Sequence, residues 1–183
     1  MCSEHSTGAG FETREVDLEG KSEVFLAASP TGKVSMVVVD GDSLNESNVV
    51  NEYLDEVLDG RHLLPEDAKE RARARIWMLS ADSNFYPAVF VASVGRERGF
   101  PEERVSEARE KLKATLVRLE ERLGDGREHL AGGGFSLADV AHAGNFVRLR
   151  QLEEEGVLAL SDYPNGAAWV GKIEAQNSFR AAG

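Results

Sequence analysis

The chain contains almost no cysteine, and this excludes two kinds of covalent or metal stabilisation. Cys2 is the only cysteine among the 183 residues, so the sequence excludes an internal disulfide framework and a thiolate metal cage. The histidines do not share the close spacing of paired metal ligands, and they stand at His5, His62, His129 and His142. We therefore expect no metal.

Long apolar runs are also missing. A membrane-spanning helix needs roughly 18 consecutive apolar residues, whereas the segment 85–94 is too short and contains Pro87. The first six residues, Met1 to Ser6, have neither a basic region nor an apolar run, so we expect no signal peptide. The sequence predicts a cytoplasmic protein with no membrane partner.

Basic residues are too few for several classes of partner. The chain has 21 Lys and Arg against 32 Asp and Glu, which gives a formal net charge of −11. Nucleic acids and anionic membranes attract clustered positive charge, so neither is an expected partner. A hydrophobic content of 42% is ordinary for a globular protein, and a chain of this length buries on the order of 70% of its unfolded surface.

The first third of the chain has a short, mixed α/β pattern. The dense apolar run at 34–39 predicts a strand, and Asp40-Gly41 provides the positive-φ pair of a tight hairpin turn. The expected elements are a strand at 12–17, a helix at 22–28, strands at 34–39 and 42–44, and a helix from Asn45 that ends at Gly60.

From Pro65 onward the pattern is helical throughout. Apolar residues at helical spacing predict long helices after Pro65, with a bend near Pro87, and over 101–123; further helices begin at Ser136 and Pro164. The fold class is α/β plus all-α. The expected domains are residues 11–62 and 65–183, preceded by a tail at 1–10.

A series of segments in a fixed order resembles the glutathione S-transferase family. The resemblance covers residues 11–179 and implies an incomplete thioredoxin-like N-terminal domain followed by the family's C-terminal helical bundle. It rests on Pro30-Thr31-Gly32-Lys33-Val34, Glu46-Ser47-Asn48, Glu52-Tyr53-Leu54-Asp55-Glu56, Leu63-Leu64-Pro65 with the Ala-Arg-rich run 71–75, Phe135-Ser136-Leu137-Ala138-Asp139, and Tyr163-Pro164-Asn165 with Trp169.

The resemblance implies a glutathione site, with glutathione as co-substrate. A helix N-terminus can hold a carboxylate, and in the family the residues that match Ser47 and Glu46 hold the γ-glutamyl carboxylate and amino group. Lys33 would contact the glycyl carboxylate, and Val34 the cysteinyl part. The alternative is plain helix capping, because Ser43 and Glu46 have the spacing of a capping box.

Two further motifs have structural readings beside functional ones. Ser136 and Asp139 also have capping-box spacing, and we assign them to the stability of the helical domain rather than to catalysis. Some aromatic residues of the long helix are expected to line an apolar electrophile pocket or to belong to the core, and both remain open: Trp77, Phe85, Tyr86 and Phe90.

Two departures from the family pattern concern the thiol. Only residues 1–10 precede the part that matches the family's second strand, so the segment carrying the catalytic Tyr, Ser or Cys has no match, and the catalytic residue is unknown. Cys2 and Ser3 lie too close to Phe11 to match it. Ser35 stands where the family has a cis-proline. With the first strand unmatched, we expect rearranged pairing of the strand at 12–17 or a partner chain beside it.

Two functions therefore remain open, and so does whether the chain is an enzyme. The first is a glutathione S-transferase-like protein that binds glutathione or a related thiol and transfers it at most weakly to small electrophiles. The second is a non-catalytic binding or scaffold protein with the same fold, as in the relatives of stringent starvation protein A and in translation-factor appendages. By the same resemblance we expect a homodimer.

Overall fold

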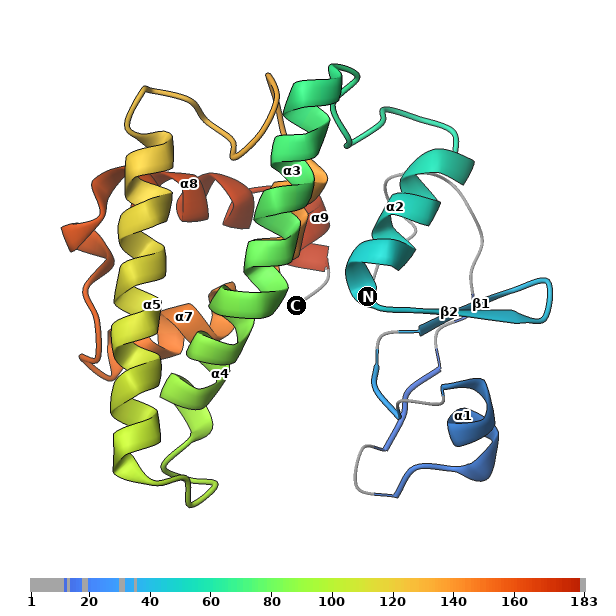
Figure 1. Ribbon diagram of the computed structural model, residues 1–183, viewed down its shortest axis with the longest axis horizontal. Coiled ribbons are helices and arrows are strands. Elements are labelled where there is room, and N and C mark those ends of the chain that lie inside the picture. Colours follow the sequence, from blue (N-terminus) through green and yellow to red (C-terminus); the bar gives the residue numbers. More distant parts are fainter. Residues whose placement is uncertain (1–11, 13, 18–19, 30–31, 35, 182–183) are drawn as a thin grey trace. The chain divides into compact units, whose positions relative to one another are not determined.

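A computed structural model describes residues 12, 14–17, 20–29, 32–34 and 36–181. The chain forms two compact units that divide between His62 and Leu63 (Figure 1). We call them unit 1 and unit 2 and describe each by itself.

Unit 1 contains a β-hairpin between two helices. Its elements are α1 (Glu23–Ala28), β1 (Met36–Val39), β2 (Asp42–Asn45) and α2 (Ser47–Val57). Helix α1 begins where the sequence predicts it, because the Ser22 hydroxyl accepts a hydrogen bond of 3.2 Å from the Phe25 N–H. The Phe25 side chain is buried and anchors this short helix.

The hairpin confirms the predicted turn. Strands β1 and β2 are antiparallel, with Met36 opposite Asn45 and Val39 opposite Asp42. Asp40 and Gly41 both have positive φ, 51° and 90°, which is the geometry of a two-residue turn that matches the strand twist. This turn fixes the register, so it also fixes where β2 ends and α2 begins.

The strand predicted at 12–17 is wrong for the residues that the structure describes there. Glu12 and residues 14–17 form no strand, and Glu12 is instead held in an exposed ion pair with Arg14. Of the two alternatives expected for this segment, rearranged strand pairing is not found among the described residues, and a partner chain beside it stays a prediction. Loose alternation of polar residues does not specify a strand without an apolar face to bury.

Unit 2 is entirely helical in its described part, which agrees with the predicted fold class. Its elements are α3 (Ala68–Ser80), the π-helix η1 (Ala81–Phe85), α4 (Tyr86–Val94), α5 (Glu102–Leu123), α6 (Leu137–Ala143), α7 (Phe146–Glu154), the 3₁₀ turn η2 (Leu160–Asp162), α8 (Pro164–Glu174) and α9 (Asn177–Ala181). None of the helices among the described residues is long and apolar enough to cross a membrane.

The irregularity predicted near Pro87 is a π-helical turn. Pro87 has no N–H and its ring crowds the preceding turn, and the five residues of η1 join α3 to α4 just before it. The Tyr86 N–H donates to the Ala81 carbonyl, five residues back, instead of the usual four. The chain thus continues as one long, locally widened helix.

The core of unit 2 forms where the sequence places its apolar stripes. On α5 the predicted stripe is buried throughout, at Val105, Ala108, Leu112, Leu116 and Leu119. This face packs against α4 and α8, and Phe85, Phe146 and Trp169 fill the space between the helices.

A buried carboxylate organises the start of α6. Asp139 is fully buried, and its Oδ2 accepts hydrogen bonds from the Ser136 N–H (2.9 Å) and the Ser136 hydroxyl (2.8 Å). Its Oδ1 accepts from the Leu130 N–H (3.1 Å) and from Trp169 Nε1 (2.8 Å). The predicted capping box is therefore present, and it also ties the preceding loop and α8 to α6.

Candidate functional site

Glu46 has an unusual backbone conformation at the junction of β2 and α2. Its φ of 67° and ψ of 111° lie outside the left-handed region that non-glycine residues sometimes adopt. Such a conformation costs on the order of 1–3 kcal/mol and is concentrated at functional sites. The chain maintains it at an exposed residue that glycine could replace, which points to a role for the Glu46 side chain.

The start of α2 is left without a side-chain cap. Glu46 occupies the N-cap position and forms no capping hydrogen bond, and the first intrahelical bond runs from the Val50 N–H to the Glu46 carbonyl (3.0 Å). Ser43 lies within β2, so the capping box that its spacing with Glu46 suggested does not form. The alternative reading of plain capping is wrong. Ser47, the first helical residue, is exposed, with its hydroxyl beside the positive end of the helix dipole.

The hairpin register places the other predicted site residues near the same end. Met36 pairs with Asn45, so Val34 and Glu46 both lie just beyond that pair, at the open end of the hairpin. Val34 and Lys33 are exposed. The register therefore brings Val34 and Glu46 towards the same end of the hairpin, with Lys33 and Ser47 next to them in the sequence. The Val34–Ser35 peptide, where the family has a cis-proline, lies outside the described residues.

Two hydrogen bonds hold the loop before Val34. Ser29 is fully buried, and its hydroxyl donates a hydrogen bond of 3.0 Å to the Lys33 carbonyl. Gly32, with φ of 62°, donates its N–H to the Ser29 carbonyl at 2.8 Å. These contacts fix the backbone that carries Lys33 and leave its ammonium group in solvent.

The charges at this end suit a ligand that carries both signs. The α2 N-terminus and Ser47 can donate to a carboxylate, and Glu46 can accept from an ammonium group. Lys33 supplies a second positive charge for a second carboxylate. One acceptor is also unused, because Asn45 Oδ1 is buried and has no hydrogen-bond partner among the described residues. A search of the described residues for three or more clustered metal-binding side chains finds none.

The aromatic residues of the long helix divide between core and surface. Phe85 is fully buried and belongs to the core, which is one of the two alternatives left open for it, and Trp77 is half-buried against the core. Tyr86 is 50% exposed and Phe90 is half-buried, and their ring centroids lie 5.9 Å apart. Of the four, Tyr86 is the most exposed.

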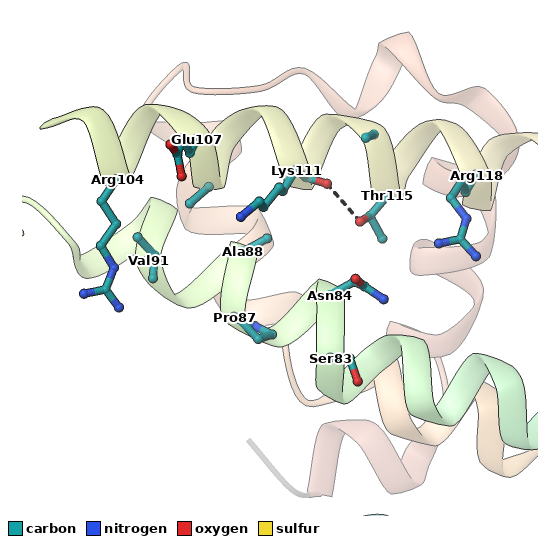
Figure 2. Close-up of a pocket in the computed structure, with 12 residues that line it drawn as sticks. Ser83, Asn84, Pro87, Ala88, Val91, Arg104, Glu107, Lys111, Thr115 and Arg118 are labelled. Atoms are coloured by element: carbon teal, nitrogen blue, oxygen red, sulfur yellow. Dashed lines mark hydrogen bonds between the residues drawn. The ribbon is translucent and has the colours of Figure 1, made fainter.

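A separate groove lies between α4 and α5 in unit 2. It has a volume of about 620 Å³, and its lining includes small side chains such as Ala88 (Figure 2). Three cations seven residues apart extend along its α5 side: Arg104, Lys111 and Arg118. None of the four aromatic residues named above lines it.

Unit 1 is a hairpin that leads into a helix without a side-chain cap, and unit 2 is helical with a buried capping box. Together they are typical of a protein with a small thioredoxin-like domain followed by a helical bundle. Comparison with known proteins identifies the family. The family model of the glutathione S-transferase N-terminal domain matches residues 5–56, and that of the C-terminal domain matches residues 102–172. The chain belongs to the glutathione S-transferase family.

Individual relatives agree over most of the chain. Glutathione S-transferase F14 of Arabidopsis thaliana is 35% identical over 181 residues, covering 91% of this chain and 70% of the relative. The structure of glutathione transferase F7 from Populus trichocarpa has a TM-score of 0.81 at 26% identity, covering 97% of this chain and 88% of that one. A glutathione S-transferase from Methylobacillus flagellatus, solved with glutathione bound, has a TM-score of 0.73 at 27% identity and covers 85% of this chain and 78% of its own.

Two features of the structure, one in each unit, could not be predicted from the sequence. The strained φ of Glu46 leaves no signal in the residue type, because glutamate is not a turn residue. The guanidinium groups of Arg98 and Arg148 both lie over the ring of Phe90, at 5.2 and 5.5 Å from its centroid. These arginines are 50 positions apart in the chain, and neither belongs to a motif, so only the packing of α4 against α7 shows the cluster.

Proposed function

We propose that unit 1 binds glutathione by its γ-glutamyl end and that the chain transfers it at most weakly to small electrophiles. The observation that carries this proposal is the strained, uncapped junction at Glu46, which keeps the α2 N-terminus available. Membership of the family and the relative solved with glutathione support the choice of ligand.

Each residue of the site has a chemical counterpart in glutathione. The Ser47 hydroxyl and N–H would donate to the glutamyl carboxylate, and the Glu46 carboxylate would accept from the neighbouring ammonium group. Lys33 would pair with the glycyl carboxylate at the far end of the tripeptide. The backbone of Val34 would hold the cysteinyl part between them.

Weak transfer follows from the residue after Val34. A serine at position 35 takes up a cis peptide only at a cost of about 2.5–4 kcal/mol, which a proline largely removes. The backbone that should hold the cysteinyl part is therefore less well organised for the thiol than in the family pattern. The same observation favours the second candidate function, a non-catalytic binding or scaffold protein that retains the glutamyl end of the site.

Calorimetric titration of the full chain with glutathione tests the binding. Replacing Ser47→Ala should weaken binding roughly tenfold or more, because a hydrogen bond to a charged group is lost. Ser106→Ala, an exposed serine on α5, is the matched control and should leave the affinity unchanged. If S47A binds glutathione as tightly as the original chain, the proposed site is wrong.

Turnover separates the two candidates. We expect conjugation of glutathione to 1-chloro-2,4-dinitrobenzene only slightly above the uncatalysed rate. Binding with no turnover would establish the scaffold function in place of transfer. Fast turnover would contradict the argument from Ser35, and we then expect a Ser35→Pro variant to raise it no further.

A further inference from the structure

The start of α8 is capped by a glutamate of another helix. Tyr163 at the N-cap position forms no side-chain capping hydrogen bond with the described residues, and Pro164 at the next position has no N–H to donate. The Glu120 carboxylate, from α5, accepts hydrogen bonds from the Asn165 N–H (3.2 Å) and the Gly166 N–H (2.8 Å). We call this contact the Glu120 cap.

The same carboxylate also holds the side chain of Asn165. Asn165 Nδ2 donates to Glu120 Oε1 at 2.6 Å, so the side-chain amide of Asn165 and the backbone N–H of Gly166 are bonded to one acceptor group. Glu120 is half-buried, whereas Asn165 is exposed to water. The Glu120 charge lies at the positive end of the α8 dipole, which stabilises a carboxylate there.

Asn165-Gly166 is the only Asn-Gly pair in the chain, and this dipeptide is chemically reactive. Glycine has no side chain to block the approach of its backbone nitrogen to the preceding asparagine side chain. The Gly166 nitrogen bonds to Asn165 Cγ, the Cγ–Nδ2 bond breaks, and ammonia leaves with the electron pair of that bond and the proton of the Gly166 nitrogen. Water then opens the cyclic imide to aspartate or isoaspartate, and ammonia takes up the proton that the new carboxylic acid releases.

The Glu120 cap opposes this reaction in two ways. The Gly166 nitrogen must give up its proton to attack, and a carboxylate 2.8 Å away disfavours the negative charge that develops there. The hydrogen bond from Asn165 Nδ2, together with the helical backbone of α8, restricts the rotation that brings Cγ onto that nitrogen. The reaction therefore requires the start of α8 to open locally first.

We propose that Asn165 is a site of spontaneous deamidation, that the Glu120 cap sets the rate, and that the reaction breaks the contact between α5 and α8 once it occurs. The product has a carboxylate in place of the amide that donated to Glu120, and two carboxylates at this distance repel each other. Trp169, one turn further along α8, donates to the buried Asp139, so a loosened α8 weakens the core of unit 2. This inference does not depend on glutathione binding.

Peptide mapping by mass spectrometry, after incubation of the full chain at pH 7.5 for increasing times, measures deamidation at each asparagine. A free peptide of residues 160–170 gives the rate without the fold. We expect Asn165 to react at least about tenfold more slowly in the chain than in the peptide, and Glu120→Ala to raise its rate in the chain by at least about tenfold. The matched control is Glu121→Ala, the next residue of α5 and exposed, which should leave the rate unchanged.

A second asparagine and a second variant make the result specific. Asn177, followed by Ser178 in α9, should react at the same rate in E120A as in the original chain. Gly166→Ala should suppress the reaction in E120A, and a Cβ at this position has room, with its nearest neighbours Tyr163 Cβ at 3.6 Å and Glu120 Oε2 at 3.7 Å.

Three outcomes would overturn the role of the cap. The first is an Asn165 rate in the original chain equal to that in the peptide. The second is equal acceleration at Asn165 and Asn177 in E120A, because general unfolding would then be the cause. The third is continued modification in E120A/G166A, because the Gly166 nitrogen would then not be the attacking group.

Asn165→Asp tests the structural consequence, because it introduces the product carboxylate directly. An aspartate in the first turn of a helix is ordinarily stabilising, but here it faces Glu120. We expect N165D to lower the urea midpoint of the chain that retains Glu120, and to leave the midpoint unchanged or raise it in E120A. The same change in both backgrounds would overturn the proposed break between α5 and α8, because Glu120 would then not cause it.

Discussion

At the scale of single residues, His142 combines complete burial with an unused ring nitrogen. Its Nδ1–H donates to the Ala138 carbonyl at 2.8 Å, since a carbonyl can only accept, and this leaves Nε2 unprotonated. Nε2 is buried and has no partner among the described residues, and the rings of Trp77, Phe85 and Trp169 surround the imidazole. A proton on Nε2 would therefore be poorly solvated.

Burial lowers the pKa of His142 from 6.5 to about 4, against the opposing effects of the Ala138 hydrogen bond and the Asp139 charge. The unfolded chain binds a proton below pH 6.5 and the folded chain does not until about pH 4, so stability falls as pH falls through this window. Over the whole window the loss is roughly 3 kcal/mol. Urea unfolding at pH 7.5 and pH 5 should show part of it.

His142→Gln keeps a hydrogen-bond donor and does not titrate, so its stability should depend less on pH between 7.5 and 5. His62→Gln is the control, because His62 is exposed and also has its Nδ1 near a backbone carbonyl, that of Asp55 at 2.7 Å. It should retain the full pH dependence of the original chain. The same dependence in H142Q would mean that other groups cause it.

At the scale of elements, the start of α6 depends on one carboxylate. Asp139→Ala would leave the Ser136 N–H, the Leu130 N–H and Trp169 Nε1 without their acceptor inside the core. We expect a loss of roughly 3–5 kcal/mol in unfolding free energy, measured by urea titration. Asp139→Asn retains one acceptor oxygen and should lose less.

The control for this prediction is an aspartate of the same unit at the surface. Asp125 is exposed and pairs with Arg127, and ion pairs of this kind contribute about 0–1 kcal/mol. Asp125→Ala should therefore have little effect on stability. A small effect of D139A, comparable to that of D125A, would show that α6 is held by packing alone.

The sequence predicts elements well where a local rule decides them. Asp40-Gly41 specifies a hairpin turn, and the spacing of Ser136 and Asp139 specifies a helix start, and both are confirmed. It fails where tertiary contacts decide. Ser43 and Glu46 have the same spacing as a capping box, but the hairpin register holds Ser43 in β2, so the same pattern gives a different structure.

The site residues also divide into those that the sequence predicts and those that depend on tertiary packing. The resemblance to the family proposes Lys33, Val34, Glu46 and Ser47, and the hairpin register accounts for Val34 and Glu46 lying towards the same end although they are 12 residues apart. The contact of Arg98 and Arg148 with the Phe90 ring could not be predicted, because it depends on how α4 packs against α7. Periodicity shows which helix face is buried and not which partner it meets.

At the scale of the whole molecule, charge is divided unequally between the two units. Of the 32 acidic residues, 13 lie in residues 1–62 with only four basic ones, whereas residues 63–183 carry 19 acidic and 17 basic residues. Unit 1 is therefore strongly negative and unit 2 nearly neutral. The lining of the groove between α4 and α5 has a net positive charge, because it contains three basic residues and one acidic residue, Glu107.

This division suits a homodimer in which the cationic groove of one copy faces the acidic unit 1 of another, because opposite potentials steer and orient association. Sedimentation velocity should give about twice the 19.9 kDa of the chain. Lys111→Glu with Arg118→Glu should shift the equilibrium toward monomer, and high salt should act in the same direction.

The control is Lys113→Glu, on the same helix but outside the groove and paired with Glu110. A monomer at every concentration would reject the dimer, whereas a dimer that K111E/R118E leaves intact would place its interface elsewhere on the molecule.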